Sequence, residues 1–505
     1  MSKINYELAK KAEALKSGLK HKKIYPKQQV RFENDGNAFQ NLAVKTIKES
    51  ELPVVLKSGE SVILDFGCHN VGYLNFSLNH LPEHITDSPI NLKFTFGEFP
   101  LEITTPPESY NGSLGRCWLQ NEDKTVVFTP YTGVLERRYS FRYLKIERTD
   151  DAVFPIAITD IFSDSVSCVD VDDVKPVKID DPRLKKIYDI CLETLKECEQ
   201  DVFEDGPKRD RRLWIGDLRL QALTDYYTFN NTDLIKRCIY LFAAYRTDKG
   251  FVAPCVFPDS DPYVDQWIFA DYSLFIISCL YDYTVHTNDK TLLKELYGIA
   301  KEQIMLIMDN FAEFFGSVND SFFIDWCRDL DKSVASVGLY LYTLNQFVKI
   351  SGMLDENCDF AVSEIEKAKK LILSYYSKEE GLFIAMSGQI SWHSQVWAAL
   401  AGVFSQEDTV KLLENTELKN PGYIMHTPYM MHYYIEALFN CGLKDKAMSF
   451  IKDYWGKIVD YGFDCCPEVF NPQNHLESPY NAPEINSACH AWSCTPAYWI
   501  RKYNM

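Results

Sequence analysis

The chain has 505 residues, of which 46% are hydrophobic and 14% aromatic, and this composition excludes a mainly disordered protein. The length allows two or three domains. The formal net charge of −18 argues against a nucleic-acid partner and against an anionic membrane surface, since both require clustered basic side chains.

The first 30 residues are predicted to form an N-terminal extension that is Lys-rich and lacks the apolar run of a signal peptide. No apolar run in the chain is long enough to span a bilayer. The 15 cysteines show no zinc-ligand spacing, and free thiols in a reducing compartment are the simplest interpretation. We therefore expect a cytoplasmic protein with no metal and no cofactor, and we leave a homo-oligomer open.

Residues 31–174 have the pattern of an antiparallel β-sandwich. Short β-prone runs follow one another at fairly regular spacing, separated by turn residues. The predicted strands are two runs within 53–66 that a turn separates, followed by 70–78, 90–99, 125–129, 139–147 and 153–169.

Residues 175–505 have the pattern of an all-α domain. About a dozen helices are connected by short segments or by segments that carry Gly, Pro, Asn or Asp, which favours αα-hairpins. Such hairpins can close into an (α/α)6 toroid whose inner helix ends line a central cleft. The predicted helices are 182–202, 212–229, 232–246, 264–287, 290–315, 333–351, 359–376, 392–404, 407–414, 428–440, 443–455 and 487–503.

One short run between the first two of these helices holds most of the chemistry. It reads Asp205-Gly-Pro-Lys-Arg-Asp-Arg-Arg-Leu-Trp-Ile-Gly-Asp217. If a helix begins near Lys208, then Asp210, Trp214 and Asp217 lie on one face. Two acids around an indole make a poor core face, because buried carboxylates are costly without partners. They suit a pocket that binds a sugar ring and delivers a proton to it.

Simpler interpretations of the same residues remain open. Asp205 can be a helix N-cap, Asp210 a surface partner of a nearby arginine, and Trp214 an ordinary core residue. Asp271 follows a loop rich in Pro and Asp, and it suits a cleft position or a helix cap equally well.

The run 205–217 resembles the central motif of the bacterial α-L-rhamnosidases of glycoside hydrolase family 78, and it aligns without gaps. A second segment, Trp455-Gly-Lys-Ile-Val-Asp-Tyr-Gly-Phe-Asp-Cys-Cys-Pro-Glu468, resembles the family's other carboxylate motif, with the glutamate at the same offset. Asp325-Trp326 and Ser487-Ala-Cys-His490 also correspond to positions where the family has cleft residues.

The resemblance implies inverting hydrolysis by two carboxylates, without a metal or cofactor. Asp210 falls on the general-acid position and Glu468 on the general-base position. Substrate-binding positions fall on further residues of the two motifs and of the weaker matches; they are Asp205, Arg209, Trp214, Asp217, Trp326 and His490, to which we add Asp271 from its place in the sequence. The implied substrate is a small glycoside or oligosaccharide with a terminal α-L-rhamnosyl or related deoxy-sugar.

Two departures from the family pattern bear on this interpretation. The family usually has Glu where this chain has Asp210, and Asp is one methylene shorter, which changes the reach of the acid. The loop before Glu468 also differs, so the glycone is open. The alternatives are a glycosidase with another sugar preference, a sugar-binding protein without turnover and, ranked last, an epimerase or lyase, which would require paired His or a Tyr/His set.

Overall fold

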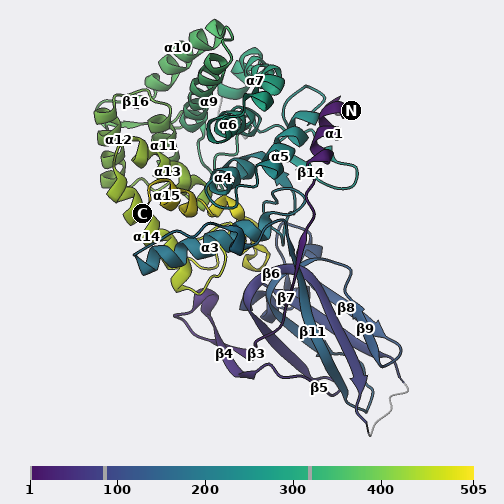
Figure 1. Ribbon diagram of the computed structural model, residues 1–505. Coiled ribbons are helices and arrows are strands. Elements are labelled where there is room, and N and C mark those ends of the chain that lie inside the picture. The colour runs from purple at the N-terminus through teal and green to yellow at the C-terminus, as the bar shows by residue number, and fades with distance from the viewer. Residues whose placement is uncertain (1–2, 83–87, 317–320, 505) are drawn as a thin grey trace.

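The computed structural model describes residues 3–82, 88–316 and 321–504, which fold into a β-sandwich followed by a helical toroid (Figure 1). Residues 1 and 2 of the predicted N-terminal extension lie outside the described residues. None of the helices formed by the described residues combines the length with the apolar character that a bilayer crossing requires. The sandwich and the (α/α)6 toroid confirm the predicted fold class, and we retain the predicted division at residue 174 as a proposal.

The sandwich is one antiparallel sheet that folds over on itself. Its strands are β2 (Lys20–Ile24), β3 (Gln28–Asn34), β4 (Leu42–Glu49), β5 (Val54–Leu56), β6 (Ser61–His80), β7 (Ile90–Gly97), β8 (Asn121–Val126), β9 (Tyr131–Val134), β10 (Tyr139–Arg148) and β11 (Ile156–Ser167). The main strand order is β2-β11-β6-β10-β7-β8, with β3, β5 and β9 paired to β6 or β11 and β4 paired to β3. Alternating apolar side chains of these strands form the core.

The longest strand, β6, replaces two predicted strands. It continues through residues 67–69 because Gly67 adopts a φ of +77°, and its register with β10 shifts between Phe141 and Tyr143. A bulge of this kind lets one strand bend and contribute to both layers of a sandwich.

The N-terminal residues pack on both parts of the molecule. Helix α1 (Tyr6–Ala14) lies against the helical part, and β2 then runs down along the edge of the sandwich to pair with β11 (Figure 1). The side chains of β2 are mostly exposed and carry no apolar alternation, which is why the sequence pattern does not predict this strand.

The described residues of the helical part form a ring of twelve main helices. They are α3 (Pro182–Cys198), α4 (Ile215–Asp225), α5 (Thr232–Ala244), α6 (Ala270–Thr287), α7 (Lys290–Asp309), α9 (Ser333–Met353), α10 (Asp359–Ser374), α11 (Trp392–Leu400), α12 (Gln406–Lys419), α13 (Pro428–Asn440), α14 (Lys444–Asp460) and α15 (Pro496–Lys502). Short helices α2 (Pro100–Thr104) and α8 (Phe311–Phe315) lie in connections.

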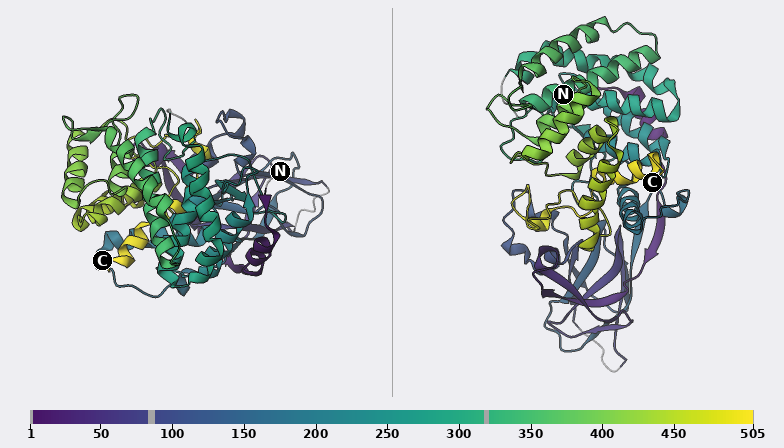
Figure 2. Two further views of the ribbon diagram at one scale, coloured as in Figure 1. Left: turned by 90° about the horizontal axis from the view of Figure 1, so that it is seen from above. Right: turned by 90° about the vertical axis from the view of Figure 1, so that its left-hand side faces the viewer.

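The inner ring of the toroid closes through consecutive contacts. Helix α4 packs on α6, α6 on α9, α9 on α11 and α11 on α13, and the 3₁₀ turn Ala491–Ser493 joins α13 back to α4. Inner helices such as α4 are buried on nearly all sides, whereas outer helices such as α7 bury one stripe. Figure 2 shows the ring above the sandwich, with C-terminal segments between the two parts.

A buried pair of acids gives the fold a pH dependence that can be measured. Asp225 and Glu199 lie together, and both side chains are fully buried. Burial raises the pKa of Asp225 to about 7, and burial together with the Asp225 charge raises that of Glu199 well above its usual value.

We therefore expect the free energy of unfolding to fall less steeply with rising pH in Asp225→Asn than in the wild type. The folded pair keeps protons that the unfolded carboxyls release near pH 4, so the free energy of unfolding falls as pH rises from there through 7, by up to about 1.4 kcal/mol per pH unit for each proton. Melting temperatures of both proteins between pH 5 and 8.5, with surface variant Asp189→Asn as the control, test this. Parallel curves for the wild type and Asp225→Asn would contradict it.

Candidate active site

The loops that precede the inner helices enclose a cavity of about 1350 Å³ at one end of the toroid. All six connections contribute to its lining, from the 205–214 segment to the 468–492 segment. Among the predicted site residues, the following line it: Asp205, Arg209, Asp210, Trp214, Asp217, Trp326, Glu468 and His490. The fold therefore brings together side chains that are far apart in the sequence.

The central motif reaches this cavity in a way the helical periodicity does not predict. Helix α4 begins only at Ile215, and residues 205–212 form turns, so the predicted shared helix face of Asp210, Trp214 and Asp217 is wrong. Trp214 belongs to the short strand β12 (Leu213–Trp214), and of the three only Asp217 lies in the helix, in its first turn.

Asp205 holds these turns in place instead of capping a helix. Its two carboxyl oxygens accept the backbone N–H groups of Asp210 and Arg212, at 3.2 and 3.1 Å. The turn also requires a small residue at Gly206, because a Cβ there would lie 2.6 Å from the Arg209 carbonyl oxygen and 2.9 Å from Ser487 Oγ. The local fold thus follows from Asp205 and Gly206, and it directs Asp210 into the cavity.

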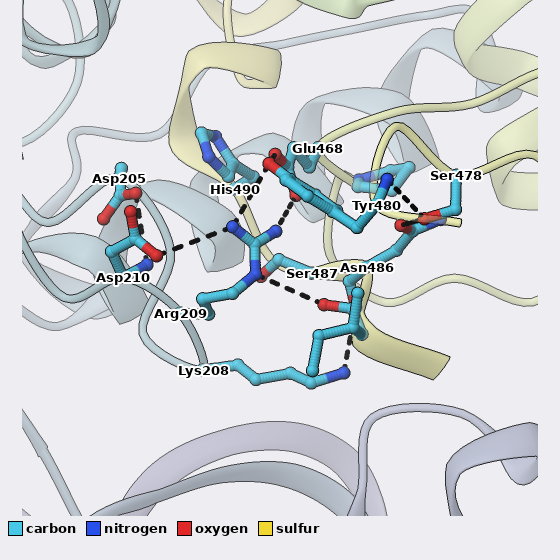
Figure 3. Close-up of polar contacts among 12 residues, drawn as sticks. Asp205, Lys208, Arg209, Asp210, Glu468, Ser478, Tyr480, Asn486, Ser487 and His490 are labelled. Atoms are coloured by element: carbon cyan, nitrogen blue, oxygen red, sulfur yellow. Dashed lines mark hydrogen bonds and ion pairs between the residues drawn. The ribbon is translucent and has the colours of Figure 1, made fainter. Parts of the chain in front are cut away.

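Arg209 links the two motif carboxylates (Figure 3). Its Nη1 lies 3.6 Å from Asp210 Oδ1 and 3.2 Å from the Tyr480 hydroxyl, and its Nη2 donates to Glu468 Oε2. Burial disfavours the charge of Arg209, but the Glu468 and Tyr480 groups outweigh burial and raise its pKa above the usual value. The guanidinium therefore stays charged and fixes both carboxylates relative to each other.

Hydrogen bonds with residues of the 480–492 segment hold both the backbone and the side chain of Glu468. Its N–H donates to the Ser487 carbonyl at 3.0 Å, its carbonyl accepts Trp492 Nε1 at 3.0 Å, and its Oε1 accepts the Tyr480 hydroxyl at 2.5 Å. The Glu468 side chain is 2% exposed, whereas that of Asp210 is 18% exposed. Asp210 is thus the more accessible of the two carboxylates to a bound molecule.

The carboxyl groups in the cavity lie close to one another. Burial, and then the Asp210 charge, raise the pKa of Asp205 to about 8. Burial, followed by the charges of Asp205 and Glu468, raises the pKa of Asp217 well above its usual value. Burial and the nearby Arg209 lower the pKa of His490, so its imidazole is neutral at pH 7.

Three buried polar atoms of cavity-lining residues make no hydrogen bond among the described residues. They are Asp217 Oδ1, Trp214 Nε1 and His490 Nδ1, and the first and third lie 3.5 Å apart. Buried polar atoms are nearly always hydrogen-bonded in folded proteins. Because their residues line the cavity, these atoms are candidates for hydrogen bonds to a polar ligand.

Two predicted substrate-binding residues differ in their placement. Trp326 is 38% exposed at the cavity and packs edge-on against Tyr480 and Phe323. Asp271 is fully buried and is not among the lining side chains. Its oxygens accept the N–H groups of Phe323 and Ile324 at 2.9–3.1 Å, so it holds the 321–332 loop and has no free acceptor facing the cavity.

Sequence reasoning missed Tyr480, which bonds Glu468 and packs under Arg209 with the guanidinium 4.2 Å from its ring centre. It lies in a loop without periodicity, and no spacing links it to either motif. Trp492, in the 3₁₀ turn Ala491–Ser493, also lines the cavity. The Nζ of Lys208 donates to the backbone carbonyls of Glu484 and Asn486, both at 2.9 Å, and so supports the loop that carries Tyr480.

Two family models together match nearly the whole chain. The glycosyl hydrolase family 78 α-rhamnosidase N-terminal domain matches residues 26–164, and the bacterial α-L-rhamnosidase six-hairpin glycosidase domain matches residues 172–503. No curated protein matches the chain.

Solved structures agree with the family models. A rhamnosidase from Klebsiella oxytoca with rhamnose bound is 36% identical, with a TM-score of 0.95 and all of both chains covered. The family 78 rhamnosidase of Bacillus sp. GL1 shares the fold at 18% identity and a TM-score of 0.73, over 92% of this chain and 50% of its own. The α-L-rhamnosidase of Streptomyces avermitilis, complexed with L-rhamnose, shares it at 13% identity and a TM-score of 0.66, over 96% of this chain and 44% of its own.

Proposed function

The chain belongs to the bacterial α-L-rhamnosidases of glycoside hydrolase family 78, and from this premise we propose that it removes a terminal α-L-rhamnosyl residue from a small glycoside by inversion. Asp210 acts as the general acid and Glu468 as the general base. The observation that carries this proposal is the pair of carboxylates on one cavity wall, bridged by Arg209.

The acid step requires a carboxyl that can reach the glycosidic oxygen. Asp210 is the more exposed of the pair, and it lies within 3.6 Å of both the Arg209 and the Arg212 guanidinium groups. It protonates the oxygen of the leaving group as the bond to the anomeric carbon breaks. An aglycone oxygen leaves poorly as an anion, so this proton transfer lowers the barrier.

The base step uses water on the opposite face of the sugar ring. Glu468 takes a proton from that water as the water attacks the anomeric carbon, and Arg209 and Tyr480 orient its two oxygens. Inverting enzymes hold their carboxyl groups about 6.5–9.5 Å apart to admit the water. Bridging through a whole guanidinium, rather than by direct contact, is compatible with that separation.

We assign the glycone to the part of the cavity lined by Asp217, Trp214 and His490, whose side chains carry polar atoms that make no hydrogen bond among the described residues. Asp217, Trp214 and His490 offer hydrogen bonds to ring hydroxyls, and Trp326 offers a flat apolar face for the ring. A sugar that lacks a matching hydroxyl would leave these buried groups unpaired. The rhamnose in the Klebsiella oxytoca structure supports rhamnose as the sugar.

The fifteen cysteines are all free thiols, which suits a reducing compartment. We infer a cytoplasmic location and substrates that are small enough to be imported.

A panel of 4-nitrophenyl glycosides tests the proposed function. We expect release of 4-nitrophenol from the α-L-rhamnoside with kcat/KM at least about 100-fold above that on other glycosides. Preferred turnover of another sugar would overturn the glycone assignment. Absence of turnover on every glycoside, with L-rhamnose still raising the melting temperature, would favour a sugar-binding protein and overturn the hydrolase mechanism.

A further inference from the structure

Three potential metal ligands meet where the sandwich contacts the loop that carries Glu468. His69 lies on β6, and Cys465 and Cys489 lie in the C-terminal loop region. One ring nitrogen of His69 and the two sulfur atoms lie within 4.8 Å of one another, and all three side chains are buried. Within the described part of the chain, no other group of three or more His, Cys, Asp or Glu side chains is arranged this way.

The imidazole of His69 is oriented as a metal ligand requires. Its Nε2 lies 3.1 Å from Glu98 Oε1 and 3.0 Å from Ser140 Oγ, while the Ser140 hydroxyl gives its own proton to Glu98 at 2.8 Å. Both groups therefore act as acceptors toward Nε2, which carries the proton. That tautomer leaves a lone pair on the buried Nδ1 atom, and the Cys465 thiol lies next to the imidazole.

Glu98 is held as a carboxylate and not as a proton donor. Its Oε2 accepts the Ala488 N–H at 2.6 Å and lies 3.9 Å from the buried ammonium group of Lys208. A carboxylate that fixes the tautomer of a histidine in this way is the usual outer partner of a histidine bound to zinc.

We propose that His69 Nδ1 and the sulfur atoms of Cys465 and Cys489 bind one Zn²⁺ ion. Two thiolates and one imidazole supply three of the four ligands of tetrahedral zinc. Zinc bonds of about 2.0–2.3 Å hold tetrahedral ligand atoms about 3.5–4 Å apart, so the three atoms need only small side-chain rotations to reach that spacing. Each thiol releases its proton to solvent as it binds.

The proposed ion would join two parts of the molecule at the active site. Cys465 precedes Glu468 by three residues, and Cys489 adjoins His490, while His69 belongs to the sandwich. Zinc would thus anchor both C-terminal segments of the cavity wall to the sandwich. Its effect on catalysis rests on the proposed function, whereas the zinc site itself does not.

Another thiol pair shows what the cluster adds. Cys191 and Cys466 also lie close, with their sulfur atoms 3.7 Å apart. Among the described residues, this pair has no histidine close enough to form a group of three potential metal ligands. The zinc assignment therefore rests on the oriented imidazole and not on the neighbouring thiols alone.

Metal analysis of the full-length chain, purified with a reductant and dialysed against metal-free buffer, tests the proposal. We expect about one equivalent of zinc per chain, and on replacement by Co²⁺ a thiolate-to-cobalt charge-transfer band. Cys465→Ser and His69→Gln should each lower the retained zinc by about tenfold or more. Cys279→Ser, which alters a buried thiol outside the cluster, should retain the full equivalent.

The wild-type protein alone can overturn the proposal, even if a variant fails to fold. Less than a tenth of an equivalent of zinc, with no cobalt band in the reduced protein, would do so. A Cys465–Cys489 disulfide in the freshly isolated protein, seen as the loss of two hydrogens by mass spectrometry, would also do so. Neither readout depends on enzymatic activity, so the zinc proposal can be tested even if the rhamnosidase assay fails.

Discussion

Replacing Asp210 with Asn is expected to lower kcat/KM by about 10²–10⁴-fold on a rhamnoside whose leaving group is an alcohol. Asn keeps the size of the side chain and its position beside Arg209 but has no proton to give. A leaving group of low pKa, such as 2,4-dinitrophenol, departs without protonation. Initial rates on substrates of graded leaving-group pKa should therefore show a loss that shrinks as that pKa falls.

Two comparisons sharpen the Asp210 experiment. Asp210→Glu restores the family's usual residue but moves the carboxyl by about one bond length, and we expect it to lose on the order of 10²-fold because the turn built by Asp205 and Gly206 is set for Asp. Asp329→Asn, on the same cavity wall, should change rates little. An equal loss for Asp210→Asn at every leaving group would rule out the acid role.

Glu468→Gln is expected to lower kcat by about 10²–10⁴-fold on every leaving group alike, since activation of water does not depend on the aglycone. Gln keeps one acceptor oxygen for Arg209, and its NH2 group can donate to the Tyr480 hydroxyl, so the cavity should keep its shape. Loss of the charge leaves Arg209 buried without its closest counter-ion, and we expect a lower melting temperature as well. Rates and melting curves measured on one preparation separate these two effects.

Azide provides a direct assay of the base role. As a nucleophile that needs no deprotonation, it should restore turnover in Glu468→Gln and yield the β-L-rhamnosyl azide. Glu477→Gln is the matched control, a cavity carboxylate paired with His426 at 2.5 Å, and it should neither lose comparable activity nor respond to azide. Full activity in Glu468→Gln would remove this residue from the mechanism.

The sequence pattern predicted the two-part fold because its elements are apolar at regular periods. Inner helices such as α9 and strands such as β10 carry that signal in their own residues. Strands β2 and β4 do not, since most of their side chains are exposed and they form only by pairing with β11 and β3. Their existence depends on tertiary partners that a local pattern does not contain.

The candidate site was only partly predicted, because its assembly also depends on tertiary contacts. Resemblance to the family identified Asp210 and Glu468, but no spacing along the chain brings them together; closure of the inner ring does. Helical periodicity gave the wrong local structure for 205–214, because Asp205 stabilises turns with its carboxyl oxygens. Tyr480 lies in an irregular loop and becomes recognisable only through its contacts.

Proton NMR of rhamnose released from 4-nitrophenyl α-L-rhamnoside tests the central claim most directly, because it reports how the two carboxylates act. With Asp210 as acid and Glu468 activating water on the opposite face, the β-anomer should appear first and convert to the equilibrium mixture only by slow mutarotation. First appearance of the α-anomer would mean retention through a covalent intermediate and would contradict the proposed roles of both residues.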